Sequence, residues 1–290
     1  MRPFTFSTAL FAATTLAKNG GSGVDCADGL YMIAARGTTE DKGPGVIGTI
    51  AEAVAKRVKG SVVKALDYPA TLQDPDYKDS EAAGVKAMTS AVNNYHQACP
   101  NGKIAVFGYS QGGQIASDTF CGGSGGDFPT NKPIDEDIVK DSVVAIIVFG
   151  DPSHVANTSY DLGDSINDGI FKRNDTKLCE DNYSKIIRSY CDTGDVYCDQ
   201  GNNTETHGGY FEKYGSEVAD FVVKQYKSAE ESESKTTSTS ATATATETTG
   251  SATGTAETTA AGAPGNAAAG LVPGIIFAMV PVVLAMSQYL

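Results

Sequence analysis

Five short apolar runs recur between residues 30 and 190, separated by polar or glycine-containing stretches. Runs of this length, bounded by turn residues, are typical of buried β-strands. The fourth run is almost uninterrupted, as expected for a parallel strand that is covered on both faces. The predicted strands are Leu30–Ala35, Ser61–Leu66, Lys103–Phe107, Ser142–Phe149 and Ser184–Tyr190.

The segments between these runs show the spacing of an amphipathic helix, with apolar residues every three or four positions. Pro44 stands where a first helical residue often does, and apolar residues then recur from Ile47 to Val58. Further helices are predicted from Lys78 to Ala98 and from Lys213 to Lys227. Strands that alternate with helices in this way predict an α/β sandwich around a central parallel sheet.

The chain changes character along its length, which divides it into regions. Residues 1–17 carry Arg2 before a short apolar stretch, which is the form of a secretory signal peptide. Residues 24–227 are mixed in composition and long enough for one core, so we expect a single folded domain there. Residues 228–270 consist almost entirely of Ser, Thr, Ala and Gly, which is typical of a disordered, O-glycosylated stalk.

The last segment, residues 271–290, is uncharged and mostly apolar. A transmembrane helix is one interpretation, but basic residues normally follow such a helix, and no Lys or Arg follows Lys235. Small residues around Gly262, a short spacer and an apolar tail match a GPI-attachment signal instead, which is the interpretation we favour.

Two further features indicate a secreted glycoprotein. Six cysteines, an even number, suit three disulfides in an oxidising compartment. N-glycosylation sequons occur at Asn157, Asn174, Asn182 and Asn202. We therefore expect an extracellular protein, anchored at the cell surface or cell wall.

The charge and the ligand types exclude several functions. A formal net charge of −13 argues against nucleic-acid binding, which needs a basic face. The chain has only three histidines and no H-E-x-x-H or C-x-x-C pattern, so we expect neither a metal site nor a cofactor. Nothing indicates an oligomer, and the expected form is a monomer that meets a membrane only through its lipid anchor.

Candidate chemistry lies at Gly108-Tyr109-Ser110-Gln111-Gly112, directly after the third predicted strand and before a run of small, helix-compatible residues. This is the G-x-S-x-G nucleophile elbow in the context that it requires. A chance match in a chain with 32 glycines is the alternative, and the strand and helix on either side argue against it. Ser110 is therefore the predicted nucleophile of an enzyme that cleaves esters or related acyl bonds.

A serine nucleophile needs an imidazole base, and the imidazole needs a carboxylate that fixes its tautomer. In α/β-hydrolases the acid and then the histidine follow the serine. His96 precedes Ser110, and His154 lies only three residues after Asp151, the acid that would have to serve it from the same loop. His207, in a glycine- and asparagine-rich loop before the last helix, is the preferred base.

Three aspartates follow the fifth strand and are candidates for the acid: Asp192, Asp195 and Asp199. Asp195 lies midway between Cys191 and Cys198, where a disulfide would hold its side chain in place. We prefer Asp195 and expect the other two to be solvated loop charges.

The strand order suggests a pairing for the cysteines. Cys26 and Cys99 each lie shortly before a strand, at the same end if those strands are neighbours. Cys191 and Cys198 bracket one loop, which leaves Cys121 and Cys179 for each other. The sequence alone permits other connectivities, so this pairing is a hypothesis.

Several motifs together resemble the cutinase family, which includes fungal cutinases and acetylxylan esterases, over about residues 25–226. The motifs are Ala35-Arg36-Gly37-Thr38-Thr39, Tyr68-Pro69-Ala70, Gly108-Tyr109-Ser110-Gln111-Gly112, Phe149-Gly150-Asp151-Pro152, the segment from Cys191 to Cys198, and His207-Gly208-Gly209-Tyr210. The resemblance implies a small, lidless α/β-hydrolase with a five-stranded parallel sheet and helices on both faces.

The resemblance also implies roles for individual residues. Ser110, Asp195 and His207 would be the catalytic triad, and the oxyanion hole would comprise the backbone N–H of Gln111 with the backbone N–H and hydroxyl of Thr38. The chain departs from the family in two places: Thr38 stands where cutinases usually have serine, and Cys198 lacks the adjacent second cysteine of many acetylxylan esterases.

The loops expected around the elbow are polar, which favours a small acyl group on a polysaccharide over a wax-like polyester. Tyrosines suited to stacking on sugar rings are Tyr77, Tyr160, Tyr197 and Tyr210. We therefore expect an esterase that deacetylates plant polysaccharide, with cutin hydrolysis as the alternative. A non-catalytic, anchored surface protein on a hydrolase scaffold is the alternative from another class.

Overall fold

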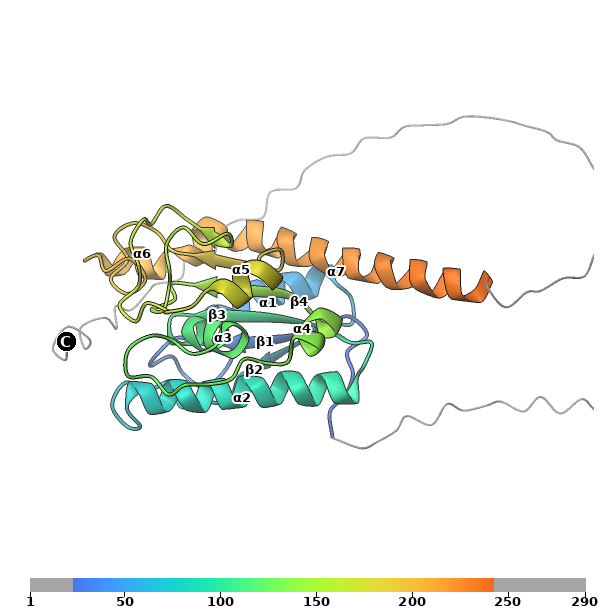
Figure 1. The fold of residues 1–290 in the computed structure, drawn as a ribbon, viewed down its shortest axis with the longest axis horizontal. Helices are drawn as coiled ribbons and strands as arrows, with labels where there is room; N and C mark the ends of the chain where they lie inside the picture. Colours follow the sequence, from blue (N-terminus) through green and yellow to red (C-terminus); the bar gives the residue numbers. More distant parts are fainter. Residues whose placement is uncertain (1–22, 243–290) are drawn as a thin grey trace, which may run out of the picture. The chain divides into compact units, whose positions relative to one another are not determined.

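A six-stranded parallel sheet with helices on both faces forms the centre of the computed structural model, which describes residues 23–242 (Figure 1). The strand order is β2-β1-β3-β4-β6-β5, and every neighbouring pair is parallel. The strands are β1 (Leu30–Ala35), β2 (Val62–Ala65), β3 (Lys103–Tyr109), β4 (Val143–Phe149), β5 (Asp161–Leu162) and β6 (Ile187–Tyr190). The helices are α1 (Gly48–Arg57), α2 (Tyr77–Ala98), α3 (Gln111–Cys121), α4 (Glu136–Ser142), α5 (Lys177–Asn182), α6 (Thr204–Gly208) and α7 (Tyr210–Thr242).

The α/β fold with a parallel sheet is confirmed, but the expected number of strands is wrong, because the sheet has six and not five. The additional strand, β5, has two residues and pairs only with Ser189 and Tyr190 of β6 at the edge of the sheet. Asp161, its first residue, is polar, so β5 has no apolar run that marks it in the sequence. The short helices α4, α5 and α6 were likewise not predicted.

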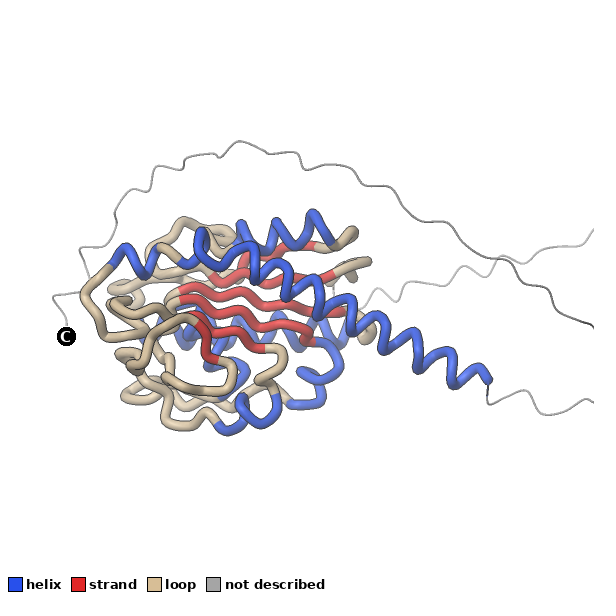
Figure 2. Tube along the Cα trace, turned by 90° about the horizontal axis from the view of Figure 1, so that it is seen from above, coloured by secondary structure: helices blue, strands red, loops and turns tan. Residues whose placement is uncertain are grey.

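Alternate side chains of the central strands form two separate cores. Met32 of β1 packs with α1 and α7, whereas its neighbour Ile33 packs with α2 and α3 on the other face. This is the period of two that a strand covered on both faces requires. Seen from above, the long C-terminal helix crosses the strands of one face obliquely (Figure 2). The three-layer arrangement follows from these two cores.

Parallel strands bring the segments that follow β1, β3, β4 and β6 to one edge of the sheet. In open α/β sheets this carboxyl edge is where ligands bind. The segments here begin at Arg36, Ser110, Gly150 and Cys191. All of the motifs that carry the candidate chemistry, except the one that contains His207, start at this edge.

The structure contains the three disulfides that the sequence predicts: Cys26–Cys99, Cys121–Cys179 and Cys191–Cys198. The first joins the segments that precede the neighbouring strands β1 and β3. The second ties the end of α3 to α5, and the third closes the loop after β6.

The C-terminal helix α7 continues past Lys227, where we expected the stalk to begin, as far as Thr242. The residues that directly follow Lys227 include Ala229, three glutamates and Lys235, which favour helix. The chain divides into two compact units at residues 229 and 230. The predicted signal peptide, most of the predicted stalk and the predicted GPI signal lie outside the described residues. Within residues 23–242, no helix is both long and apolar enough to cross a membrane.

Candidate active site

Ser110 occupies the turn between β3 and α3 in a backbone conformation that side-chain-bearing residues rarely adopt, with φ 54° and ψ −121°. Its backbone N–H donates to the carbonyl of Phe149 at 2.9 Å, and its own carbonyl accepts from Gln114 at 3.0 Å. These bonds to β4 and to the first turn of α3 hold the strained turn. The side chain is buried, with 6% of the residue exposed.

The two glycines of the elbow are required by contact with backbone. A Cβ atom at Gly108 would lie 2.3 Å from the carbonyl oxygen of Gly112, and one at Gly112 would lie 2.0 Å from that of Ala35. Neither obstacle is a flexible side chain, so neither can move aside. The collision with neighbouring strand and helix that the sequence predicts is therefore present.

His207, in α6, contacts Asp195 through its Nδ1, which lies 2.8 Å from Asp195 Oδ2. An ionised carboxylate only accepts hydrogen bonds, so Nδ1 carries the hydrogen and Nε2 is left with a free lone pair in the neutral ring. The imidazole also lies close to the elbow. Its Cε1 would be only 2.8 Å from a Cβ atom placed on Gly150. Gly150 directly follows Phe149, whose carbonyl accepts the N–H of Ser110. The ring of Tyr109, adjacent to Ser110, also packs on His207, with centroids 5.1 Å apart.

Asp195 is fully buried and accepts four hydrogen bonds. The backbone N–H groups of Tyr197 and Cys198 donate to Oδ1 at 2.8 and 3.1 Å. His207 and the Tyr210 hydroxyl donate to Oδ2 at 2.8 and 2.6 Å. Burial alone would raise the pKa of this carboxyl, but the donors outweigh burial and hold the pKa below its ordinary value. Asp195 is therefore ionised at neutral pH.

Tyr210 contributes to the site in a way that the sequence did not predict. We expected this ring to be available for stacking on a sugar, but the residue is completely buried and its hydroxyl bonds Asp195. The same hydroxyl accepts from the backbone N–H of Asp192 at 3.1 Å. The sequence feature that could have indicated this role is the position of Tyr210, three residues after His207 in the first turn of α7.

Asp192 and Asp199 are not the solvated charges that we expected. Asp192 lies 2.8 Å from the ammonium of Lys213 and accepts from the Tyr214 hydroxyl at 2.6 Å. Asp199 is buried and accepts from the N–H of Gly194 at 2.6 Å. Asp199 also accepts from the side-chain amide of Asn167 at 3.1 Å, so both carboxylates tie the loop that carries Asp195 to other segments.

Thr38 and Gln111 each offer a hydrogen-bond donor near the elbow. The Thr38 hydroxyl is buried and has no partner, which is unusual for a buried polar group. Gln111 is the first residue of α3, so its backbone N–H has no acceptor within the helix. Its side chain is held by Ser80, whose hydroxyl donates to Oε1 at 3.0 Å.

The loop that carries Thr38 is fixed by the buried guanidinium of Arg36. Arg36 donates to the carbonyls of Glu40, Leu66, Tyr68 and Pro69, at 3.0, 3.4, 2.9 and 3.2 Å. Thr39, which directly follows Thr38, donates its N–H to the carbonyl of Ala70 at 2.7 Å. The segments after β1 and β2 are thus tied together beside the elbow.

The two remaining histidines contact other partners. His96 Nδ1 lies 2.7 Å from the hydroxyl of Ser142, which directly precedes β4, at the opposite end of the sheet from the elbow. His154 is buried between Cys198 and Asp161. Among the described residues, no group of three His, Cys, Asp or Glu side chains is placed to hold a metal ion.

Comparison with known proteins identifies the family. The sequence profile of the Cutinase family matches residues 26–226. Acetylxylan esterase 2 of Talaromyces purpureogenus is 36% identical over 201 residues, which cover 67% of this chain and 85% of that protein. Cutinase 11 of Verticillium dahliae is 34% identical over 207 residues, 69% of each chain. The solved catalytic core domain of acetyl xylan esterase from Trichoderma reesei matches with a TM-score of 0.64 at 31% identity, over 69% of this chain and 100% of that one. The chain belongs to the cutinase family of carboxylic ester hydrolases.

Proposed function

We propose that Ser110, His207 and Asp195 form the catalytic triad of this esterase. The observation that carries the proposal is the 2.8 Å bond from His207 to a buried, ionised Asp195, with the imidazole beside the strained turn of Ser110. Nε2 of His207 accepts the proton of Ser110 as its oxygen attacks the ester carbonyl. Asp195 stabilises the imidazolium that forms.

The Thr38 hydroxyl and the Gln111 N–H hold the oxyanion of the tetrahedral intermediate. A buried hydroxyl without a partner supports this role, because a donor in an oxyanion hole must be available when the charge develops. His207 then gives its proton to the departing alcohol, leaving an acyl group on Ser110. Water, activated by the same imidazole, hydrolyses this acyl-enzyme.

For the substrate we propose an acetylated plant polysaccharide. Two of the relatives named above are acetylxylan esterases, which supports this choice. The Tyr197 ring packs edge-on against His207, with centroids 4.6 Å apart, and Tyr109 packs against the same imidazole. These rings lie beside the proposed base, where they can contact a sugar that carries the acetyl group.

We propose that the mature enzyme is a monomer that acts outside the cell. The three disulfides support an oxidising, extracellular compartment. The signal peptide (1–17), the glycosylated stalk and the GPI-attachment signal (271–290) remain proposals from the sequence.

A fluorophosphonate probe tests the nucleophile. We expect one adduct on Ser110, found by peptide mapping, and none in Ser110→Ala. Absence of an adduct in folded protein would support the non-catalytic alternative. The substrate is tested by comparing nitrophenyl acetate with long-chain nitrophenyl esters, and acetylated xylan with cutin. We expect preference for acetyl, whereas long-chain preference with release of cutin monomers would contradict the proposed substrate.

A further inference from the structure

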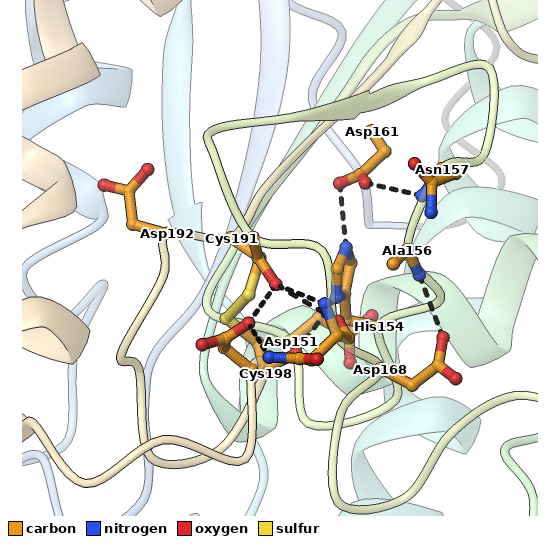
Figure 3. Close-up of polar contacts among 12 residues, drawn as sticks. Asp151, His154, Ala156, Asn157, Asp161, Asp168, Cys191, Asp192 and Cys198 are labelled. Carbon is orange, nitrogen blue, oxygen red and sulfur yellow. Dashed lines mark hydrogen bonds and ion pairs between the residues drawn. A yellow bond between two sulfur atoms is a disulfide. The ribbon is translucent and has the colours of Figure 1, made fainter.

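A second histidine–aspartate pair lies at the carboxyl edge of the sheet, outside the proposed triad (Figure 3). His154 follows β4, and only 3% of the residue is exposed. Its Nδ1 lies 3.0 Å from the carbonyl oxygen of Cys198, and its Nε2 lies 2.8 Å from Asp161 Oδ1. The imidazole therefore bridges the loop that carries Asp195 and the edge strand β5.

Both partners of the ring are hydrogen-bond acceptors. A peptide carbonyl has no hydrogen to give, and an ionised carboxylate has none either. Both ring nitrogens must then carry hydrogen, which makes His154 an imidazolium. The other oxygen of Asp161 accepts the N–H of Asn157 at 3.0 Å, so this carboxylate is itself held in place.

The charged groups around the ring favour the imidazolium. Carboxylates face it from three directions: Asp161 on β5, Asp151 after β4, and Asp168, which accepts the Ala156 N–H at 3.1 Å. Two cations of the neighbouring segment have carboxylate partners of their own: Lys172 lies 2.6 Å from Asp168, and the buried Arg173, which also donates to the Ser153 hydroxyl at 2.9 Å, pairs with Asp118. Burial lowers the pKa of His154, but the bond and charge of Asp161 outweigh burial and raise the pKa above its ordinary value.

The acceptor of the Nδ1 hydrogen bond connects His154 to the proposed catalytic acid. Cys198 is bonded to Cys191 and gives its own N–H to Asp195 Oδ1 at 3.1 Å. One residue thus accepts from His154 and donates to Asp195. Its neighbour Tyr197 is held on the same side, because its carbonyl accepts the N–H of Ile170 at 2.9 Å.

We propose that His154 is a positioning residue, whose imidazolium holds the Cys198 end of the acid loop and so keeps Asp195 aligned with His207. The proposal rests on the proposed triad. A neutral ring can donate only one of its two hydrogen bonds, so the loop loosens as pH rises through the titration of His154. Activity then falls on the alkaline side.

The test is the pH profile of kcat and KM for nitrophenyl acetate in wild type, Asp161→Asn and His154→Gln. Asp161→Asn removes the charge that stabilises the imidazolium, so the alkaline fall should move about one pH unit or more toward acid, the equivalent of losing one charged partner. The acid limb should keep its midpoint, and the change should lie in kcat and not in KM. His154→Gln has no proton to lose there, so its kcat should be lower and the alkaline fall should be absent.

Asp168→Asn is the matched control, because it removes a carboxylate of the same loop that does not bond the ring. We expect a clearly smaller alkaline shift than in Asp161→Asn. Equal profiles for Asp161→Asn and wild type, or an unchanged alkaline fall in His154→Gln, would overturn the proposal.

Nitrogen-15 NMR of the imidazole in the wild-type protein reads the protonation state without relying on any variant. We expect His154 to carry two N–H groups at neutral pH, and a neutral ring there would refute the inference. This measurement also separates the two proposals: if Ser110→Ala retained full activity, the triad would fail, whereas the NMR titration would still report on His154.

Discussion

Replacing Tyr210 with phenylalanine isolates one hydroxyl at the centre of the site. The ring is buried and packs on Phe149, with centroids 5.6 Å apart, so the substitution leaves no large cavity. Asp195 loses one of its four donors, the one at 2.6 Å, and the N–H of Asp192 loses its acceptor. The substitution therefore removes these two hydrogen bonds and the 3.3 Å contact between the same hydroxyl and Cys198 Sγ.

The size of the effect follows from those bonds. A hydrogen bond to a charged group contributes about 1.5–3 kcal/mol, and a buried N–H left without a partner costs about 1–3 kcal/mol. Because the two effects share one hydroxyl, we expect Tyr210→Phe to lower the free energy of unfolding by about 2–4 kcal/mol. Three donors keep Asp195 ionised at neutral pH but hold it less firmly, so kcat should fall about tenfold, well short of the roughly 10⁴-fold loss known for removing the charge of a triad aspartate.

The loss also depends on pH in a defined direction. A carboxyl whose pKa is lowered by folding stabilises the protein above its ordinary pKa of 3.8, and this stabilisation is lost as pH falls below that value. Removing the Tyr210 donor raises the pKa of Asp195 in the folded protein. The stability deficit of Tyr210→Phe should therefore be full at neutral pH and shrink below about pH 4.

Urea unfolding and nitrophenyl acetate kinetics measure these effects. Tyr214→Phe is the matched control, since it removes a neighbouring hydroxyl that bonds Asp192 at 2.6 Å and does not touch Asp195. We expect Tyr214→Phe to keep kcat within about twofold. The reasoning would be refuted if the two variants had the same kcat, or if Tyr210→Phe were as stable as wild type at pH 7.

Three further predictions concern other parts of the fold. Thr38→Val should lower kcat about 10²–10³-fold while leaving stability equal or greater, because the hydroxyl it removes has no partner; equal kcat would exclude the hydroxyl from the oxyanion hole. Burial, with the charge of the neighbouring Asp118, raises the pKa of Glu81 to about 9, so the folded protein keeps this acid neutral and loses stability as pH rises from about 4.5 to 9. Glu81→Gln should flatten this fall and raise the free energy of unfolding at pH 8. Parallel curves of unfolding free energy against pH for the two proteins would contradict this. Gly112→Ala should destabilise the fold by about 3 kcal/mol or more in urea unfolding, because the added Cβ would lie 2.0 Å from the Ala35 carbonyl oxygen. Gly208→Ala is the control and should not destabilise the fold, because its added Cβ would meet no atom within 4 Å.

The parts of the structure that the sequence predicts are those with a local signal. β1, β3 and β4 are apolar runs, and the strand, turn and helix around Ser110 are contiguous in the chain. The partners of a buried polar group have no such signal. Tyr210 lies 15 residues from Asp195, and His154 lies 44 residues from Cys198, so the roles of these side chains depend on how distant segments meet.

The same reason explains the misjudged acids. Asp192 and Asp199 stand in a polar loop, where an aspartate is usually solvated, and only their contacts with Lys213 and the Gly194 N–H show otherwise. β5 was not predicted because two residues carry too little pattern. Its place is fixed by pairing with β6 and by the hydrogen bond that His154 donates to Asp161.

The guanidinium of Arg36 has a consequence for the temperature dependence of the reaction. Its bonds to four carbonyls order the loop of Thr38 when the protein folds, before any ester arrives. The conformational entropy of that loop is then lost once, during folding, and not again in each turnover. An oxyanion hole that is already ordered in the free enzyme also needs little reorganisation as the negative charge forms on the substrate oxygen. The chemical step should accordingly have an activation entropy near zero, and a variant that frees this loop should show a more negative one.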